Sequence, residues 1–287
     1  MRGLTALVTF LGLTTLAACG SDGGGGGGDD APAPDAAVTG GTWKQLISKS
    51  WTLAPGGENT SELQISTTDH AMVIGGMRPL APAGTHHTVL FKGLSATNII
   101  FASGVGTGEL VFPPGKGMML ASGEALGLQL HIFNPSDQAI TGTSGIEILE
   151  VDAASVTDEV DVFLPGPKNL SIGPNKSTTQ AGTCTVTKPY TLFALFPHMH
   201  QLGKHFKTTI HAGGVDKVIH DAPYDFEHQE VLSIQPIQMA VGDTITTECT
   251  WTNPANTTVT YGESSTTEMC YSILYRFPRG NDEFCTQ

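Results

Sequence analysis

The stretch PYTLFALFPHMHQLGK, from Pro189 to Lys204, places two histidines at the end of an apolar run. The run itself is aliphatic and aromatic enough to predict a buried strand. Residues i and i+2 of a strand project from the same face, so His198 and His200 are expected to point the same way. This stretch alone leaves two explanations open. The histidines are either a pair of metal ligands or hydrogen-bonded residues at the rim of a core.

Strand-like segments continue on both sides of this stretch and form two series. Short strands separated by Gly and Pro, without a helical pattern of ten or more residues, predict an all-β chain with two β-sandwiches. We expect one domain over residues 43–155 and another over 156–287, with turns over 165–178. The first series is ELQIS, AMVIGGM, HHTVLF, NIIFAS, GLQLHIF and GIEILEV; the second is VDVFLP, YTLFALF, FKTTIHA, QEVLSIQ, DTITTECTWTN and CYSILYRF.

Charge and missing motifs exclude several functions. The 287 residues include 14 Lys+Arg and 27 Asp+Glu, which gives a formal net charge of -13. Such an acidic chain repels phosphate backbones, so nucleic acid is not an expected partner. The sequence has no H-E-x-x-H, C-x-x-C, G-x-S-x-G or P-loop motif. Zincin, thioredoxin-like, α/β-hydrolase and nucleotide-triphosphatase sites are therefore not predicted.

The first residues predict export and a lipid anchor. The apolar run LTALVTFLGLTTLAA after Arg2 is too short for a membrane span and is typical of a signal peptide. It ends in LAAC at Cys19, which resembles a bacterial lipobox. The resemblance implies a signal peptide over 1–18, acylation of Cys19 and attachment to the cell envelope, favouring the outer membrane. A Gly/Pro-rich tether is expected over 19–42. An ordinary signal peptide with a chance cysteine is the alternative.

The remaining cysteines predict disulfides in the second half of the chain. An even number of cysteines in an exported protein favours two disulfides, and four cysteines allow three connectivities. These cysteines are Cys184, Cys249, Cys270 and Cys285.

Other histidines and one methionine are further candidate ligands. His86 and His87 are adjacent, so both could reach one metal only where a strand begins, twists or bulges. His131 is expected on the same strand face as Gln129, opposite a row of leucines. Met269 is either a core residue or a soft ligand of the kind that selects Cu(I). We expect surface or structural roles for the rest, which are His70, His205, His211, His220 and His228.

The order of these motifs resembles the copper type II ascorbate-dependent monooxygenases, which include peptidylglycine α-hydroxylating and dopamine β-monooxygenases. The motifs are His-His at 86–87, L-Q-x-H at 128–131, H-x-H followed by L-G at 198–203, and E-M-C at 268–270. The similarity extends from about Trp51 to Cys285. It implies two jelly-roll-like β-sandwiches that face each other across a cleft.

The same resemblance implies a set of site residues and a reaction. Two coppers per chain are expected, with O2 as co-substrate and ascorbate or another one-electron reductant as electron donor. The reaction would hydroxylate a C–H bond of a small molecule. One copper would be held by His86, His87 and His131, with Gln129 nearby, and the other by His198, His200 and Met269. The implied disulfides are Cys249–Cys270 and Cys184–Cys285.

Substrate-binding positions depart from the peptide-hydroxylating members. Those members have an arginine at the position of Phe196, where it binds the substrate carboxylate, and asparagine and tyrosine at the positions of Tyr271 and Ile273. A more apolar or aromatic substrate is therefore expected. Two other interpretations compete with the enzyme. One is a non-catalytic copper-binding or storage lipoprotein of the cell envelope, and the other is a structural lipoprotein with incidental histidines.

Overall fold

The computed structural model describes residues 41–93, 98–262, 264, 266–280 and 284–285. Cys19, the expected signal peptide and nearly all of the expected tether lie outside the described residues. All described residues belong to one compact unit, Ala36–Gln287. Within them, no helix is both long and apolar enough to cross a membrane.

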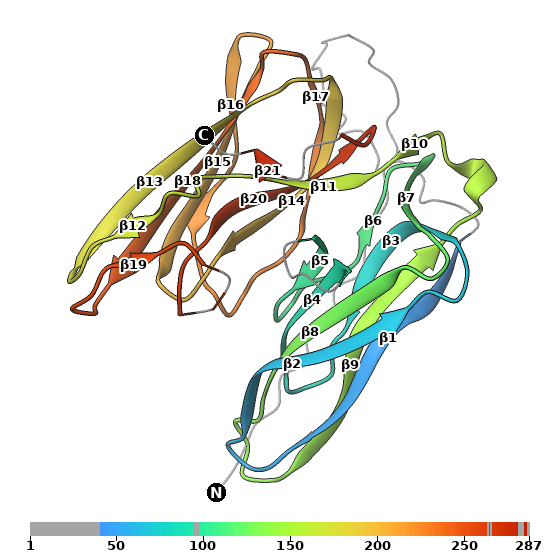
Figure 1. Cartoon of the computed structure of the whole chain (residues 1–287), viewed down its shortest axis with the longest axis vertical. Helices are drawn as coiled ribbons and strands as arrows, with labels where there is room; N and C mark the ends of the chain where they lie inside the picture. Colours follow the sequence, from blue (N-terminus) through green and yellow to red (C-terminus); the bar gives the residue numbers. More distant parts are fainter. Residues whose placement is uncertain (1–40, 94–97, 263, 265, 281–283, 286–287) are drawn as a thin grey trace, which may run out of the picture. The chain divides into compact units, whose positions relative to one another are not determined.

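Strands dominate the described residues, which confirms the all-β prediction (Figure 1). The first series forms two sheets, with strand orders β1-β9-β3-β7-β10, where β6 also pairs with β3, and β2-β8-β4-β5. Its strands are β1 (Thr42–Leu53), β2 (Glu58–Thr67), β3 (Met72–Leu80), β4 (Thr85–Lys92), β5 (Ile99–Ser103), β6 (Leu110–Val111), β7 (Lys116–Leu120), β8 (Ala125–Phe133), β9 (Ile140–Glu150) and β10 (Asp158–Glu159). A short 3-10 helix, η1 (Ala153–Ser155), precedes β10.

The second series forms sheets with strand orders β17-β14-β20-β11-β21, β13-β18-β15-β16 and β12-β19. Its strands are β11 (Asp161–Pro165), β12 (Ser171–Ile172), β13 (Lys176–Thr185), β14 (Tyr190–Met199), β15 (Gly203–Ala212), β16 (Val215–Pro223), β17 (Leu232–Met239), β18 (Thr244–Asn253), β19 (Val259–Thr260), β20 (Cys270–Phe277) and β21 (Phe284–Cys285). Among the described strands, those up to β10 and those from β11 pair only within their own series.

The prediction of turns over 165–178 was partly wrong. Ser171 and Ile172 form β12, and Lys176 already pairs with Asn253 at the start of β13. Most of β13 is exposed, so its hydrophobic alternation is weak. Hydrogen bonds between hydroxyl groups on facing strands stabilise β13 instead. One example joins Thr179 Oγ1 to Thr250 Oγ1 at 2.8 Å.

The two series share a hydrophobic core. Phe112 of the first series packs against Phe193 and Tyr275 of the second, with ring centroids 5.4 and 6.3 Å apart. All three side chains belong to the largest buried cluster. The Tyr275 hydroxyl also donates to the Ile100 carbonyl at 3.1 Å. Because these aromatic groups are buried from both sides, the two series are packed together rather than joined only by the chain.

Two disulfides join cysteines of the second series. Cys184 is bonded to Cys285, and Cys249 to Cys270. Cys270 begins β20 directly after Met269, and Cys249 lies on β18 of the facing sheet. The second bond therefore ties the end of β20 that carries Met269 to the opposite sheet. The first closes a loop of 101 residues.

Candidate metal centre

The first candidate site joins three histidines from two neighbouring strands. His87 on β4 lies directly opposite His131 on β8, and the register shifts between Thr85 and His87. His86 is the extra residue of this β-bulge, which allows adjacent histidines to approach the same point. The His86 ring centroid lies 4.9 Å from that of His87 and 4.6 Å from that of His131. One ligand atom from each of the three residues lies within 4.8 Å of the others.

Hydrogen bonds leave nitrogens of this site available to a metal. His131 Nε2 donates to Glu58 Oε1 at 2.7 Å, and His86 Nε2 donates to Glu227 Oε2 at 2.5 Å. An ionised carboxylate can only accept, so each neutral ring keeps its lone pair on Nδ1. His131 Nδ1 is 3.3 Å from His87 Nδ1. Ligands around a tetrahedral metal with bonds of about 2.0 Å lie roughly this far apart.

Burial favours the neutral form of two of these histidines, His86 and His87. His86 Nδ1 is buried and has no hydrogen-bond partner within the described residues. Burial, followed by the neighbouring His86, lowers the pKa of His87 to about 4, and burial also lowers the pKa of His86. Metals bind the neutral form of imidazole. An unpaired buried nitrogen beside neutral rings therefore fits a metal ion better than it fits a self-contained hydrogen-bond network.

The second candidate site lies at the end of β14. His198 and His200 have ring centroids 5.2 Å apart. Gln229 Nε2 donates to the Phe226 carbonyl, so Gln229 Oε1 accepts from His198 Nδ1 at 3.0 Å. His200 Nδ1 donates to the Thr267 carbonyl at 2.9 Å. Both neutral rings therefore keep their lone pairs on Nε2, whereas His86 and His131 of the first site present Nδ1.

The pKa values of these two histidines are also depressed. Burial, followed by the neighbouring His200, lowers the pKa of His198 to about 3. Burial likewise lowers the pKa of His200. Neither ring is protonated near neutral pH, so both can act as nitrogen ligands.

Met269 lies directly before β20, near the end of β14 that carries this second pair. The ladder between the two strands ends where Met199 pairs with Cys270, so His200 directly follows and Met269 directly precedes these paired residues. Met269 is half-buried at the margin of the largest hydrophobic cluster. The structure thus brings together each histidine set, while Met269 directly precedes the β20 residue that pairs with Met199.

A buried carboxylate supports that strand end. Glu268 is fully buried and accepts hydrogen bonds from the His200 amide at 3.0 Å, the Leu202 amide at 2.7 Å and Trp251 Nε1 at 2.9 Å. Burial raises the pKa of Glu268, and the three N–H donors oppose this shift because they favour the ionised form. Glu268 therefore anchors the backbone on both sides of the second site.

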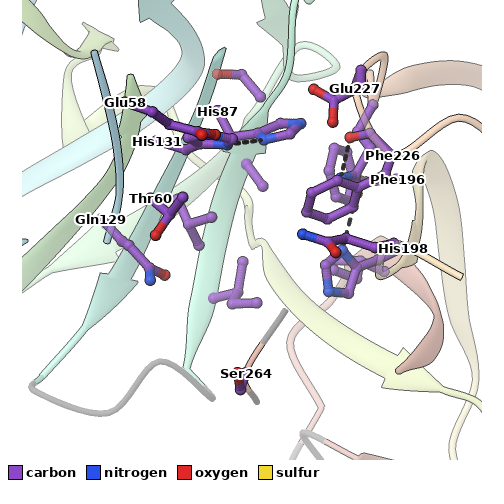
Figure 2. A pocket seen from close by; sticks show the side chains of 17 residues that line it. Glu58, Thr60, His87, Gln129, His131, Phe196, His198, Phe226, Glu227 and Ser264 are labelled. Carbon is purple, nitrogen blue, oxygen red and sulfur yellow. Dashed lines mark hydrogen bonds and ion pairs between the residues drawn. The ribbon is translucent and has the colours of Figure 1, made fainter. Parts of the chain in front are cut away.

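Both histidine sets border one pocket of ≈350 Å³ (Figure 2). His87 and His131 lie on one side of it, and His198, Phe226 and Glu227 on the other. Its other lining residues are apolar, namely Val89, Ile99, Ala102, Phe196 and Ile273, or polar, namely Glu58, Thr60, Ser103, Gln129, Gln201, Gln229 and Ser264. No Lys or Arg is among these lining residues, and the only carboxylates are Glu58 and Glu227.

Sequence reasoning missed the partners of the histidines. Glu58, Glu227 and Gln229 had no motif that could reveal them, because their roles depend on contacts between distant strands and loops. Glu268 lay within the E-M-C motif, and its position beside Met269 was the available signal. The remaining histidines mostly pair with acidic groups. Examples are His70 with Asp69, His205 with Asp221, His211 with Asp216 and His228 with Asp225.

Comparisons with known proteins indicate a family of copper monooxygenases. Residues 159–287 match the family model described as copper type II ascorbate-dependent monooxygenase, C-terminal domain. The tyramine beta-hydroxylase of Caenorhabditis briggsae is 26% identical over 212 residues, or 68% of this chain and 36% of that protein. DBH-like monooxygenase protein 1 of Mus musculus is 27% identical over 215 residues, covering 67% and 35%. The chain thus spans about a third of the length of these relatives.

Proposed function

We propose that this chain, which belongs to the copper type II ascorbate-dependent monooxygenase family, hydroxylates a C–H bond of a small apolar or aromatic substrate. The observation that carries this proposal is that two chemically different histidine sets border one pocket. We assign one copper to His86, His87 and His131 and the other to His198, His200 and Met269. The proposed domains, 43–155 and 156–287, would each hold one of these sites.

Bound copper would supply the one-electron chemistry for hydroxylating a C–H bond, in which one oxygen atom of O2 enters the substrate and the other leaves as water with two external electrons and two protons. The family uses ascorbate for those electrons, and we leave another one-electron reductant open for this chain. Imidazoles on three strands or strand ends, four of them held by a fixed acceptor, are a suitable ligand set for that ion. The Met269 thioether would favour the reduced state of the second copper.

The pocket lining supports a substrate without a carboxylate. Phe196 is buried and stacks on the His198 ring, with centroids 6.1 Å apart and an angle of 22° between the planes. Together with Ile273 it gives the pocket an apolar wall beside His198. An anionic group would meet Glu58 and Glu227 and no lining cation. Apolar side chains would instead orient a hydrocarbon or aromatic group and exclude water from it.

Metal analysis tests this proposal. Protein reconstituted with copper and then dialysed should contain two coppers per chain, because each histidine set holds one. Anaerobic reduction, followed by O2 and a screen of small apolar and aromatic compounds, should yield a hydroxylated product. A single copper, or preferential retention of zinc, would contradict the assignment. Two coppers without product for any compound, and without O2 consumption, would favour the storage lipoprotein.

We also propose that the chain is exported and anchored to the cell envelope through Cys19. The LAAC sequence and two disulfides in the second strand series support an oxidising compartment. In a bacterial host, the wild-type protein should fractionate with membranes and incorporate labelled fatty acid. Cys19→Ala should release it from the membrane fraction without label. Equal membrane recovery of both proteins would refute the lipid anchor.

A further inference from the structure

The connection between β16 and β17 contacts histidines of both candidate copper sites. Its central part, DFEHQE at residues 225–230, is called here the 225–230 segment. The Glu227 carboxylate is hydrogen-bonded to His86 of the first site, and the Gln229 amide is hydrogen-bonded to His198 of the second. Between them, the Phe226 ring lies 5.0 Å from that of His87 and 6.5 Å from that of His200. One short segment thus meets two rings of each site.

Several hydrogen bonds hold this segment in place. The Gln229 carbonyl accepts from the Gly104 amide and from Thr107 Oγ1, each at 2.8 Å. A Cβ on Gly104 would lie 2.7 Å from the Gln229 main-chain nitrogen and oxygen, so only glycine permits this approach. Just before the segment, the Tyr224 hydroxyl donates to the Met199 carbonyl at 2.6 Å and accepts from its amide at 3.0 Å. Hydrogen bonds therefore hold the segment near both of its ends.

The orientation of the Gln229 amide follows from its two bonds. Gln229 is 6% exposed, and its Nε2 donates to the Phe226 carbonyl at 3.0 Å. Reversing the amide would place two oxygens against each other at that carbonyl. Oε1 must therefore face His198 Nδ1, which makes Nδ1 the protonated nitrogen and directs Nε2 away from the segment. The amide thus selects the tautomer and fixes the direction of the ring.

We propose that Gln229 and Glu227 are positioning residues, each of which orients one histidine so that the correct ring nitrogen meets copper. The inference rests on the proposed function because it requires copper at both sites. The two residues differ in charge. His198 donates to the neutral amide of Gln229, whereas His86 donates to the carboxylate of Glu227. The carboxylate makes the His86 imidazole a more basic ligand. Such outer partners orient metal ligands and are worth roughly 10- to 100-fold in metal affinity.

Gln229→Leu tests the assignment at the second site. Leucine has a similar size but cannot accept from His198 Nδ1. We expect the affinity for one of the two Cu(I) ions to fall roughly 10- to 100-fold, with the other unchanged. The measurement is anaerobic competition against a chromophoric Cu(I) chelator, with a circular dichroism melt for each variant. Gln229→Glu keeps an acceptor for His198 Nδ1 but sets a second oxygen against the Phe226 carbonyl, so it should recover only part of the lost affinity.

Matched controls separate positioning from general damage. Gln238→Leu removes an exposed glutamine from the neighbouring strand β17 and should leave both affinities unchanged. At the first site, Glu227→Leu removes the acceptor of His86 Nε2 and should weaken the other copper, while Glu230→Leu, in the exposed part of the same segment, should not. Fewer than two coppers on the wild-type protein would overturn the proposed function and this inference with it. Two coppers with wild-type affinities in Gln229→Leu and Glu227→Leu would overturn the inference alone.

Discussion

Met269→Leu is expected to remove the copper–sulfur contribution from the X-ray absorption spectrum of the reduced protein and to lower turnover by orders of magnitude. Leucine has nearly the volume of methionine but no thioether, so only the ligand changes. Such exchanges usually cost less than about 1.5 kcal/mol of stability. Met269 is only half-buried, so the free energy of unfolding should change little. The second copper would then lack the ligand that favours its reduced state.

Two further variants identify the source of the sulfur signal. Met239 is a buried methionine in a separate hydrophobic cluster, so Met239→Leu should keep both the signal and the activity. His87→Ala should keep the sulfur signal, lose the other copper and stop turnover by interrupting electron supply. A sulfur contribution that persists in Met269→Leu would show that Met269 is only a core residue beside the Cys249–Cys270 disulfide.

Glu268→Ala is expected to cost at least about 3 kcal/mol in the free energy of unfolding of the metal-free protein. The substitution leaves two buried N–H donors and one part-buried N–H donor without an acceptor, each costing about 1–3 kcal/mol. Because two of these donors are the main-chain amides of His200 and Leu202, the second copper should also be lost. Urea unfolding would measure the loss of stability, with the same slope of unfolding free energy against urea concentration in both proteins.

An isosteric variant, Glu268→Gln, gives a second test of this prediction. Glu268→Gln keeps the shape, but its NH2 group must face at least one N–H donor, so it should also destabilise the protein. Glu230→Ala, at an exposed position, should change stability by no more than about 0.5 kcal/mol. A loss below about 1 kcal/mol in Glu268→Ala would mean that the freed donors reach other acceptors.

Most strands with a buried face were predictable from the sequence, whereas strands that are mostly exposed were harder to predict. Buried β14 and β20 are strongly apolar and lie within predicted segments. The predicted strands did not include β1, β7, β13 and β16. In β13 and β16 most residues are exposed, so hydrophobic alternation does not reveal them. They form because a neighbouring strand offers its hydrogen-bonding edge, and that information comes from another part of the chain.

By itself, the sequence determined that the described chain is all-β and that Gln129 and His131 share a strand face opposite buried leucines. These properties follow from a side-chain period of two, which is local to the strand. Only the tertiary structure decided that a bulge at His86 brings adjacent histidines together and that the 225–230 segment reaches both sites. Such contacts join residues far apart in the chain. They arise from the packing of whole sheets, which no local pattern specifies.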